Sequence, residues 1–194
     1  MKPILRALGI AASPRRNGNS TALLRAALEG ATAAGAESSI IRLNDFAFKG
    51  CQACVSCPEG SCRQHDAMTA VLAALQMADL WIFATPVYFD GVAGQFKIFY
   101  DRLYWFRRQG TTIKPRLQGQ RLAALLLTYE DPDNDHYPEM AGRIMQYVPS
   151  FGDFAPPEIL SFSGLGPTEG ASTKPDLIDK ARALGKRLVD ELHG

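Results

Sequence analysis

The sequence lacks any long apolar run, any block of like charge and any low-complexity tract. Its 194 residues carry 21 basic and 20 acidic side chains, so the net charge of +1 gives no reason to expect a nucleic-acid partner. No stretch of about 18 consecutive apolar residues is present, which argues against a membrane partner. The apolar segment Ile4–Ala12 is short, contains Arg6 and runs into a polar loop, so we do not interpret it as a signal peptide. We expect a single domain over residues 1–194 in the cytoplasm.

Side chains that form acid-base sites are also scarce. The chain has three histidines, and the spacing defines neither a Ser-His-Asp arrangement nor a pair of carboxylates. We interpret His65, beside Asp66, as a lone surface histidine. A bound cofactor that brings its own reactivity fits this composition better than side-chain catalysis.

Apolar runs and helical patterns alternate along the chain. Strands are predicted over Pro3–Ala12, Ser38–Leu43, Asp79–Ala84 (ending at Thr85-Pro86), Arg121–Thr128 and Glu158–Phe162. Helices are predicted from Ser20 to Gly35, over Met68–Met77 and Phe96–Tyr104, and over Tyr137–Val148 and Pro175–Leu192. Such alternation predicts an α/β fold with a five-stranded parallel sheet covered by helices on both faces. Ligands of these sheets bind at the carboxyl ends of the strands.

The segment Ser13–Thr21 follows the first predicted strand and precedes the first predicted helix. Free N–H groups and the helix dipole favour an anion at such a helix start. The segment adds hydroxyls, amides and two arginines, but Gly18 is its single glycine, so it matches neither common glycine-rich phosphate motif. We interpret it as a mononucleotide phosphate site. The alternative is an ordinary turn in which Asn19 or Ser20 caps the helix.

The segment Thr85–Gly91, read Thr-Pro-Val-Tyr-Phe-Asp-Gly, follows the third predicted strand. Pro86 fixes the backbone, while the three residues after it offer apolar edges and main-chain groups to a planar ring. The alternative is an ordinary connection. Together with Ser13–Thr21, this segment predicts an aromatic end and a phosphate end of one ligand.

The strings S-P-R-R-N-G-N-S-T and T-P-V-Y-F-D-G-V-A-G-Q-F-K-I-F-Y-D-R resemble the NADPH-dependent FMN reductase family of flavodoxin-like proteins. The resemblance implies a three-layer sandwich with strand order 2-1-3-4-5, and FMN as cofactor. It implies that the phosphate contacts are Ser13, Arg15, Asn17, Gly18, Asn19, Ser20 and Thr21. It implies that the isoalloxazine is bordered by Pro86, Val87, Tyr88 and Phe89, with Thr128 and Tyr129 in a third loop.

Four cysteines lie close together within a predicted loop at about residues 44–67. Their spacing, Cys51-x2-Cys54-x2-Cys57-x4-Cys62, resembles the compact motif of the iron-sulfur flavoprotein subgroup, which implies a 4Fe-4S cluster. Ala53 and the segment His65–Met68 depart from the usual surroundings of that motif. An empty site, a structural zinc or a pair of disulfides stay open as alternatives, because the spacing does not choose the metal.

Two functions follow from the resemblance. The first is an NAD(P)H-dependent flavin oxidoreductase, in which hydride passes to FMN and electrons leave to a flavin, a quinone or an iron-sulfur partner. The second is an electron-transfer carrier that cycles flavin and cluster between protein partners without NAD(P)H. A structural zinc or interaction protein would lack flavin. The resemblance implies a homodimer or homotetramer. The aromatic residues among Phe99–Phe106 cover too many helix faces for one core stripe, so we expect some of them at a subunit interface.

Overall fold

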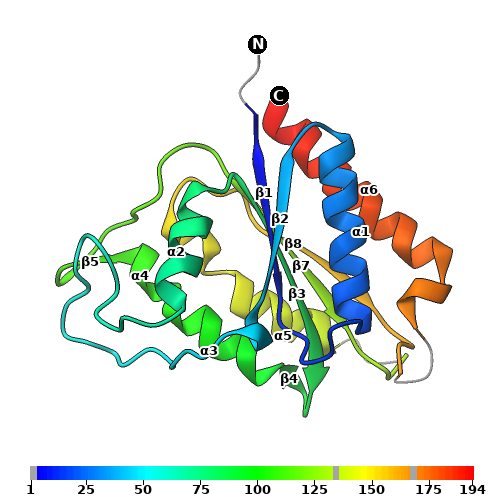
Figure 1. The fold of residues 1–194 in the computed structure, drawn as a ribbon, viewed down its shortest axis with the longest axis horizontal. Helices are drawn as coiled ribbons and strands as arrows, with labels where there is room; N and C mark the ends of the chain where they lie inside the picture. The colour runs from blue at the N-terminus through cyan, green and yellow to red at the C-terminus, as the bar shows by residue number, and fades with distance from the viewer. Residues whose placement is uncertain (1–3, 133–135, 167–169) are drawn as a thin grey trace.

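A parallel sheet with the order β2-β1-β3-β7-β8 forms the centre of the molecule (Figure 1). The computed structural model describes residues 4–132, 136–166 and 170–194, so Pro3 of the first predicted strand lies outside the described residues. The sheet strands are β1 (Arg6–Ala11), β2 (Glu37–Arg42), β3 (Leu80–Tyr88), β7 (Leu122–Thr128) and β8 (Glu158–Phe162). Five parallel strands in the order 2-1-3-4-5 were predicted, and the sheet confirms that order.

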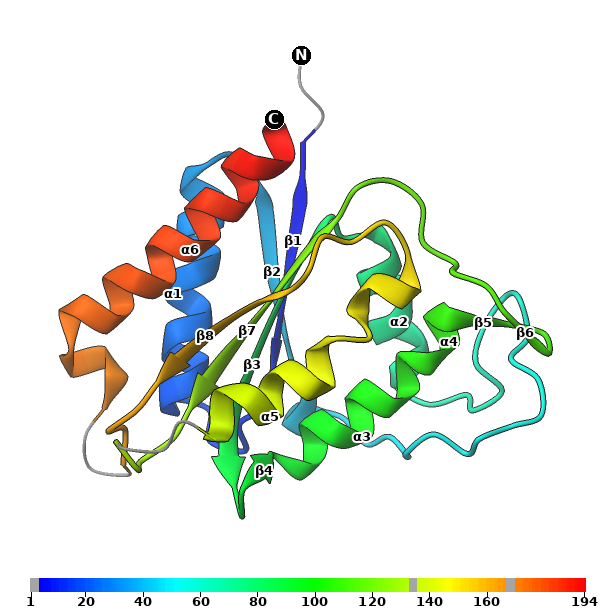
Figure 2. The same cartoon turned by 180° about the vertical axis from the view of Figure 1, so that it is seen from behind.

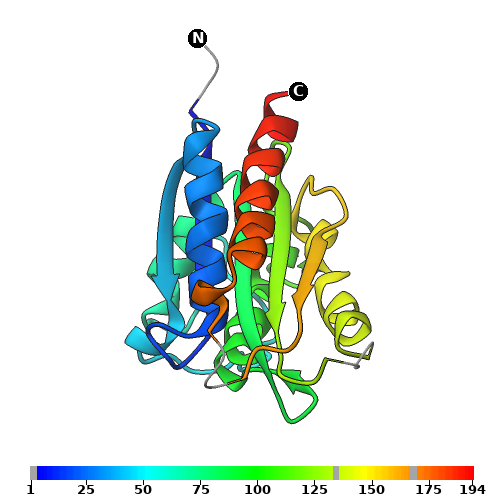
Figure 3. The ribbon, with the colours of Figure 1, turned by 90° about the vertical axis from the view of Figure 1, so that its right-hand side faces the viewer.

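Helices cover both faces of the sheet, as the alternating pattern predicts. One face carries α1 (Asn19–Ala33) and α6 (Pro175–His193), which lie side by side in Figure 3. The other face carries α2 (Met68–Met77), α3 (Gly94–Arg102), α4 (Tyr104–Arg107) and α5 (His136–Met145), which Figure 2 shows from behind. Short 3-10 turns lie at Leu43–Asp45, Val148–Phe151 and Ala171–Thr173. Within the described part of the chain, none of the helices has the length and apolar character needed to cross a bilayer.

Two cores form because successive side chains of a strand point to opposite faces. In β3, Leu80 and Ile82 face α1 and α6, while Trp81 and Phe83 face the helices on the other side, and all four are fully buried. The second core is aromatic. It includes Phe99, Tyr100, Trp105 and Phe106, all buried with Trp81 within this chain. These four residues pack on the sheet within this chain, so the expected contact of some of the aromatic group with another subunit stays a prediction for Tyr104.

The helices α1 and α6 approach each other until their backbones touch. A Cβ atom on Gly30 would lie 1.9 Å from the carbonyl oxygen of Arg182, and one on Gly185 would lie 1.8 Å from the carbonyl oxygen of Ala27. No side chain fits at either position. The two glycines therefore set how closely this helix pair covers the sheet.

Three features depart from the predicted elements. The strand β3 does not end at Thr85-Pro86, because Pro86 keeps its place opposite Thr128 and the chain continues to Tyr88. It then turns back as β4 (Gly91–Val92), antiparallel to its own end. The predicted helix Tyr137–Val148 ends early, because α5 runs from His136 to Met145 and Val148 belongs to the separate 3-10 turn Val148–Phe151. A two-stranded hairpin of β5 (Arg108–Gln109) and β6 (Thr112–Ile113) was not predicted.

Candidate functional site

The loops predicted to bind a ligand leave neighbouring strands at the same edge of the sheet. The backbone N–H of Ala12, at the end of β1, donates to the carbonyl of Ala84 in β3 at 2.9 Å. Further along, Pro86 of β3 stands opposite Thr128, the last residue of β7. The segments Ser13–Thr21, Pro86–Phe89 and Thr128–Tyr129 therefore meet at the lower edge in Figure 1. The sequence predicted this meeting.

The first loop turns tightly around Ser13. This side chain is 3% exposed, and its Oγ accepts a hydrogen bond from the backbone N–H of Arg15 at 3.1 Å. A Cβ atom on Gly18 would lie 2.8 Å from the same Oγ. Glycine at this position lets the backbone close over Ser13, so the single glycine of the loop has a steric role.

The start of α1 offers donors that the protein leaves available. Gly18 is the N-cap residue, and no side chain caps the helix there. The first N–H groups of an α-helix have no acceptor within the helix. Thr21 is buried, and within the described residues its Oγ1 has no hydrogen-bond partner. A buried hydroxyl without a partner calls for an explanation, and the oxygens of a phosphate would supply acceptors for these donors. The residues therefore fit the phosphate of FMN.

The two loop arginines differ in what they contact. Arg16 forms an ion pair with Asp45, 3.2 Å between Nη2 and Oδ1. Arg15 is exposed, and among the ion pairs of the described residues it takes part in none. Asn17 is exposed beside it. Arg15 is thus the arginine whose guanidinium a phosphate can engage without breaking an ion pair.

The side chain of Asn19 connects α1 to the segment after β8. Its Nδ2 donates to the carbonyls of Leu165 and Gly166, both at 3.2 Å, and its Oδ1 accepts from the N–H of Ala171 at 2.9 Å. Its predicted contact with the phosphate would therefore come from the backbone. Ser20, next to it, is 2% exposed.

The second loop is a tight hairpin rather than an open connection. Phe89 and Asp90 join β3 to β4, and both have positive φ, 47° and 57°. This conformation costs a bulky residue such as Phe about 1–3 kcal/mol. The Tyr137 hydroxyl donates to Asp90 Oδ1 at 2.9 Å, which steadies the turn. The hairpin holds the Phe89 ring fully in solvent at the edge where Pro86 and Val87 are half-buried.

The third loop contributes mostly buried groups. Thr128 is 3% exposed and Tyr129 is 9% exposed. The Tyr129 ring packs edge-on against Tyr137, with centroids 4.9 Å apart. Its backbone N–H donates to Phe162 at 3.1 Å. Because β3 lies between β1 and β7, these two residues stand beside the second loop on the side away from the first. A ligand would contact them chiefly through their backbone.

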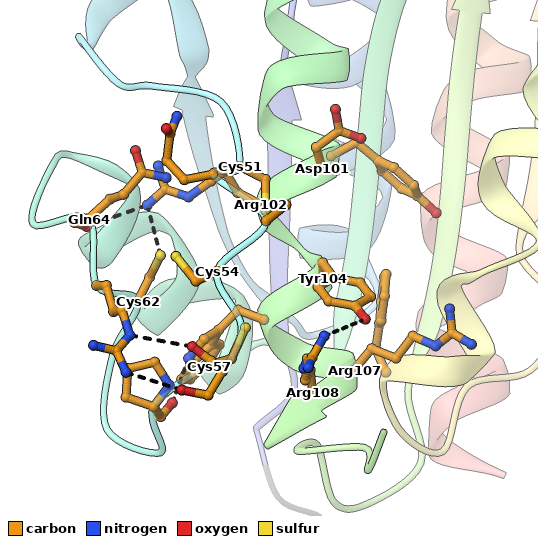
Figure 4. A pocket seen from close by; sticks show the side chains of 18 of the residues that line it. Cys51, Cys54, Cys57, Cys62, Gln64, Asp101, Arg102, Tyr104, Arg107 and Arg108 are labelled. Carbon is orange, nitrogen blue, oxygen red and sulfur yellow. Dashed lines mark hydrogen bonds between the residues drawn. The ribbon is translucent and has the colours of Figure 1, made fainter. Parts of the chain in front are cut away.

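The four cysteines line one cavity of about 470 Å³ between their loop and the helices α3 and α4 (Figure 4). All four are free thiols. Burial and the neighbouring Cys51 raise the pKa of the Cys57 thiol, against the opposing charge of Arg108. In the described ranges, no three His, Cys, Asp or Glu side chains converge closely enough to hold a metal ion. Four thiols on one cavity are the donor set that a 4Fe-4S cluster takes, so the side chains fit that group in kind.

Three arginines hold the cysteine loop. Arg108, in β5, donates to the carbonyl of Val55 at 2.6 Å. Arg116 donates to the carbonyls of Cys57 at 3.3 Å and Pro58 at 2.8 Å, and its guanidinium stacks on Trp105 at 4.4 Å. The third is Arg102, at the end of α3. The loop is thus shaped by side chains of the folded domain.

The ion pair between Arg102 and Asp66 was missed from the sequence. Its Nη1–Oδ2 distance is 2.8 Å, and the Arg102 side chain is 1% exposed. Burial raises the pKa of Asp66, but the hydrogen bond and the charge of Arg102 outweigh this effect and hold that pKa below its usual range. The available signal was a lone arginine inside the aromatic run Phe96–Phe106. The partner of Asp66 is therefore this arginine, which the sequence did not link to it.

Comparison with known proteins places these loops in a family. A family model described as NADPH-dependent FMN reductase matches residues 5–128, well over half of the chain. The chain belongs to that family. An iron-sulfur flavoprotein of Archaeoglobus fulgidus is 34% identical to this FMN reductase family member over 187 residues, which cover 96% of this chain and 80% of that protein.

Two further comparisons bear on the extent of the family resemblance. An iron-sulfur flavoprotein of Methanocaldococcus jannaschii is 38% identical over 99 residues, which cover 50% of this chain and 51% of that protein. The match thus spans about half the length of that relative. The solved NAD(P)H:quinone oxidoreductase from Methanothermobacter marburgensis superposes with a TM-score of 0.68 at 18% identity, covering 96% of this chain and 98% of that one. Such a superposition shows the flavodoxin-like fold alone, which confirms the predicted fold class of this FMN reductase family member.

Proposed function

We propose that this protein is an FMN-dependent oxidoreductase that takes electrons from NAD(P)H and passes them to a flavin, a quinone or an iron-sulfur partner. The observation that carries the proposal is the buried Thr21 hydroxyl, which has no hydrogen-bond partner among the described residues and lies at a helix start that no side chain caps. The exposed Phe89 hairpin lies on the same sheet edge. The family match to residues 5–128 supports FMN as the ligand. We further propose a cytoplasmic homodimer or homotetramer.

Each loop has one task in this proposal. Ser13, Gly18, Ser20 and Thr21 bind the phosphate through N–H and O–H donors, and Arg15 neutralises its charge. The hairpin residues Pro86–Phe89 border the ring, and Thr128–Tyr129 close its inner side. Bound FMN supplies the redox chemistry, because it accepts two electrons from a reduced nicotinamide. The protein contributes orientation and charge, which agrees with the scarcity of acid-base side chains.

The purified protein is expected to be yellow and to bleach under anaerobic conditions when NADH or NADPH is added. An absorption spectrum before and after the addition measures this. The control is dithionite, which reduces flavin without a nicotinamide site. A yellow protein that dithionite bleaches and neither nucleotide bleaches would contradict the use of NAD(P)H while leaving FMN binding intact.

The cysteine cavity favours a second candidate, an iron-sulfur flavoprotein that carries electrons between protein partners without NAD(P)H. Four free thiols line one cavity, and the sequence matches iron-sulfur flavoproteins of three organisms. In both candidates Cys51, Cys54, Cys57 and Cys62 would hold a 4Fe-4S cluster, which would supply one-electron transfer. The two candidates differ in the response to nicotinamide.

Anaerobic purification is expected to give about four iron and four sulfide per chain, the content of one 4Fe-4S cluster. The variant Cys57→Ser is expected to lose most of both, because a thiolate ligand is removed. The adjacent Ser56→Ala is the matched control and should keep the wild-type content. Iron and sulfide near zero in the wild-type protein would remove the cluster from both candidate functions.

A further inference from the structure

Arg102 is a charged side chain in an unusual place. It ends α3, within the aromatic core, and its side chain is 1% exposed. Burying a guanidinium is costly unless charge and hydrogen-bond partners surround it. The contacts of the Arg102 guanidinium therefore indicate the role of this buried charge.

The contacts of Arg102 join both ends of the cysteine loop. Its Nη1 donates to the carbonyl of Lys49 and to Asp66 Oδ2, both at 2.8 Å. Its Nη2 donates to Asp66 Oδ1 at 3.1 Å and to the carbonyl of Gln64 at 3.4 Å. One planar side chain thus connects the residue before the cysteines with the residues after them, and the carboxylate of Asp66 balances its charge.

The same side chain also reaches a sulfur atom. Its Nη2 lies 3.4 Å from Cys62 Sγ, within hydrogen-bond distance for sulfur, and Figure 4 shows this contact at the wall of the cavity. Arg108 and Arg116 contact the loop only through its carbonyls in the described hydrogen bonds. Cys62 is also the cysteine set apart from the other three by a four-residue gap. Arg102 therefore contacts the cysteine that lies farthest along the chain from the other three.

We propose that Arg102 is a positioning residue for the cysteine site. It fixes Cys62 at the cavity wall and donates an N–H to the sulfur that would ligate a cluster. Hydrogen bonds to ligand sulfurs withdraw negative charge from a cluster and raise its reduction potential. The part that concerns the cluster rests on the proposed function, whereas the hold on Cys62 does not.

The test compares Arg102→Lys with Arg116→Lys. Lysine keeps the positive charge but lacks the planar fork, so it cannot serve Asp66 and Cys62 together. In apo-protein at one fixed pH, R102K is expected to speed iodoacetamide labelling of Cys62 severalfold relative to Cys51, as mapped by mass spectrometry. After anaerobic reconstitution, R102K is expected to bind iron about tenfold or more weakly and to hold any cluster at a more negative potential. R116K loosens the same loop without removing a sulfur contact, and should keep the wild-type potential.

Unchanged Cys62 labelling in R102K would overturn the proposal, and so would an equal shift of potential in R116K. A lower iron content with an unaltered potential would overturn the sulfur hydrogen bond, since a purely structural role predicts that result. A wild-type chain that takes up no iron would overturn the cluster function and the part of the proposal that depends on it. Selective labelling of Cys62 in R102K would still support the hold on Cys62 in that case.

Discussion

Replacing Gly185 with valine is expected to lower the free energy of unfolding by about 3 kcal/mol. A Cβ atom there would lie 1.8 Å from the carbonyl oxygen of Ala27, so α1 and α6 must separate and lose packing along their whole contact. For a chain of this size, that loss corresponds to a fall of about 6–12 °C in melting temperature. Urea unfolding followed by circular dichroism measures the free energy, and a thermal scan of the same protein measures the melting temperature.

The matched control is Gly142→Ala, another glycine inside a helix. A Cβ atom on Gly142 would lie 3.7 Å from Ile159 Cδ1, an ordinary contact. Removing a helical glycine at a roomy position is expected to stabilise the protein by about 0.5–1 kcal/mol. A lower free energy of unfolding for Gly185→Val and a higher one for Gly142→Ala would support the close helix contact. Equal stability of Gly185→Val and wild type would contradict it.

The double variant Arg15→Glu with Ser20→Ala is expected to weaken FMN binding about a hundredfold or more. It reverses the charge of the exposed arginine and removes a buried hydroxyl donor at the start of α1. Each charge-assisted hydrogen bond contributes about 1.5–3 kcal/mol, and 1.4 kcal/mol is a factor of ten in affinity. Quenching of FMN fluorescence on titration with apo-protein gives the dissociation constant.

Arg16→Glu is the control for that variant, because it makes the same change of charge one residue away. Arg16 is already paired with Asp45, so its loss should change FMN affinity only a few-fold. The single variant Arg15→Glu is measured beside it. Equal weakening of FMN binding by Arg15→Glu and Arg16→Glu would indicate a general charge effect rather than a phosphate contact. Unchanged affinity in the double variant would place the phosphate elsewhere.

The fold could be predicted from the sequence because its central strands β1, β3 and β7 are buried on both sides. The continuous apolar run of β7 and the periodicity of α2 are local signals, and the bounds of α2 and β8 match the predicted ones. The predicted end of β3 was wrong. Pro86 normally marks a strand end, while here the strand continues beyond it into a hairpin. Local rules do not include the partner strand that keeps it in the sheet.

The candidate site divides in the same way. The loop Ser13–Thr21 is continuous in sequence, so its donors could be listed before its shape was known. The pairing of Arg102 with Asp66 spans 36 residues and depends on how α3 packs against the cysteine loop. Nothing in the sequence near Asp66 indicates an arginine partner. Likewise, only the packed structure separates Arg15 from Arg16, through the ion pair with Asp45.

The helix α3 links the Phe89 hairpin to the cysteine loop, so its length governs how these two regions depend on each other. It begins at Gly94, directly after the Phe89 hairpin, and ends at Arg102 beside Cys62. Nine residues at 1.5 Å each give an axial rise of about 13 Å, which backbone hydrogen bonds keep constant. One inserted residue would also rotate Arg102 by about 100° and carry it off the sulfur. The length of this helix therefore sets both the distance between the hairpin and the cysteine loop and the direction in which Arg102 projects toward that loop.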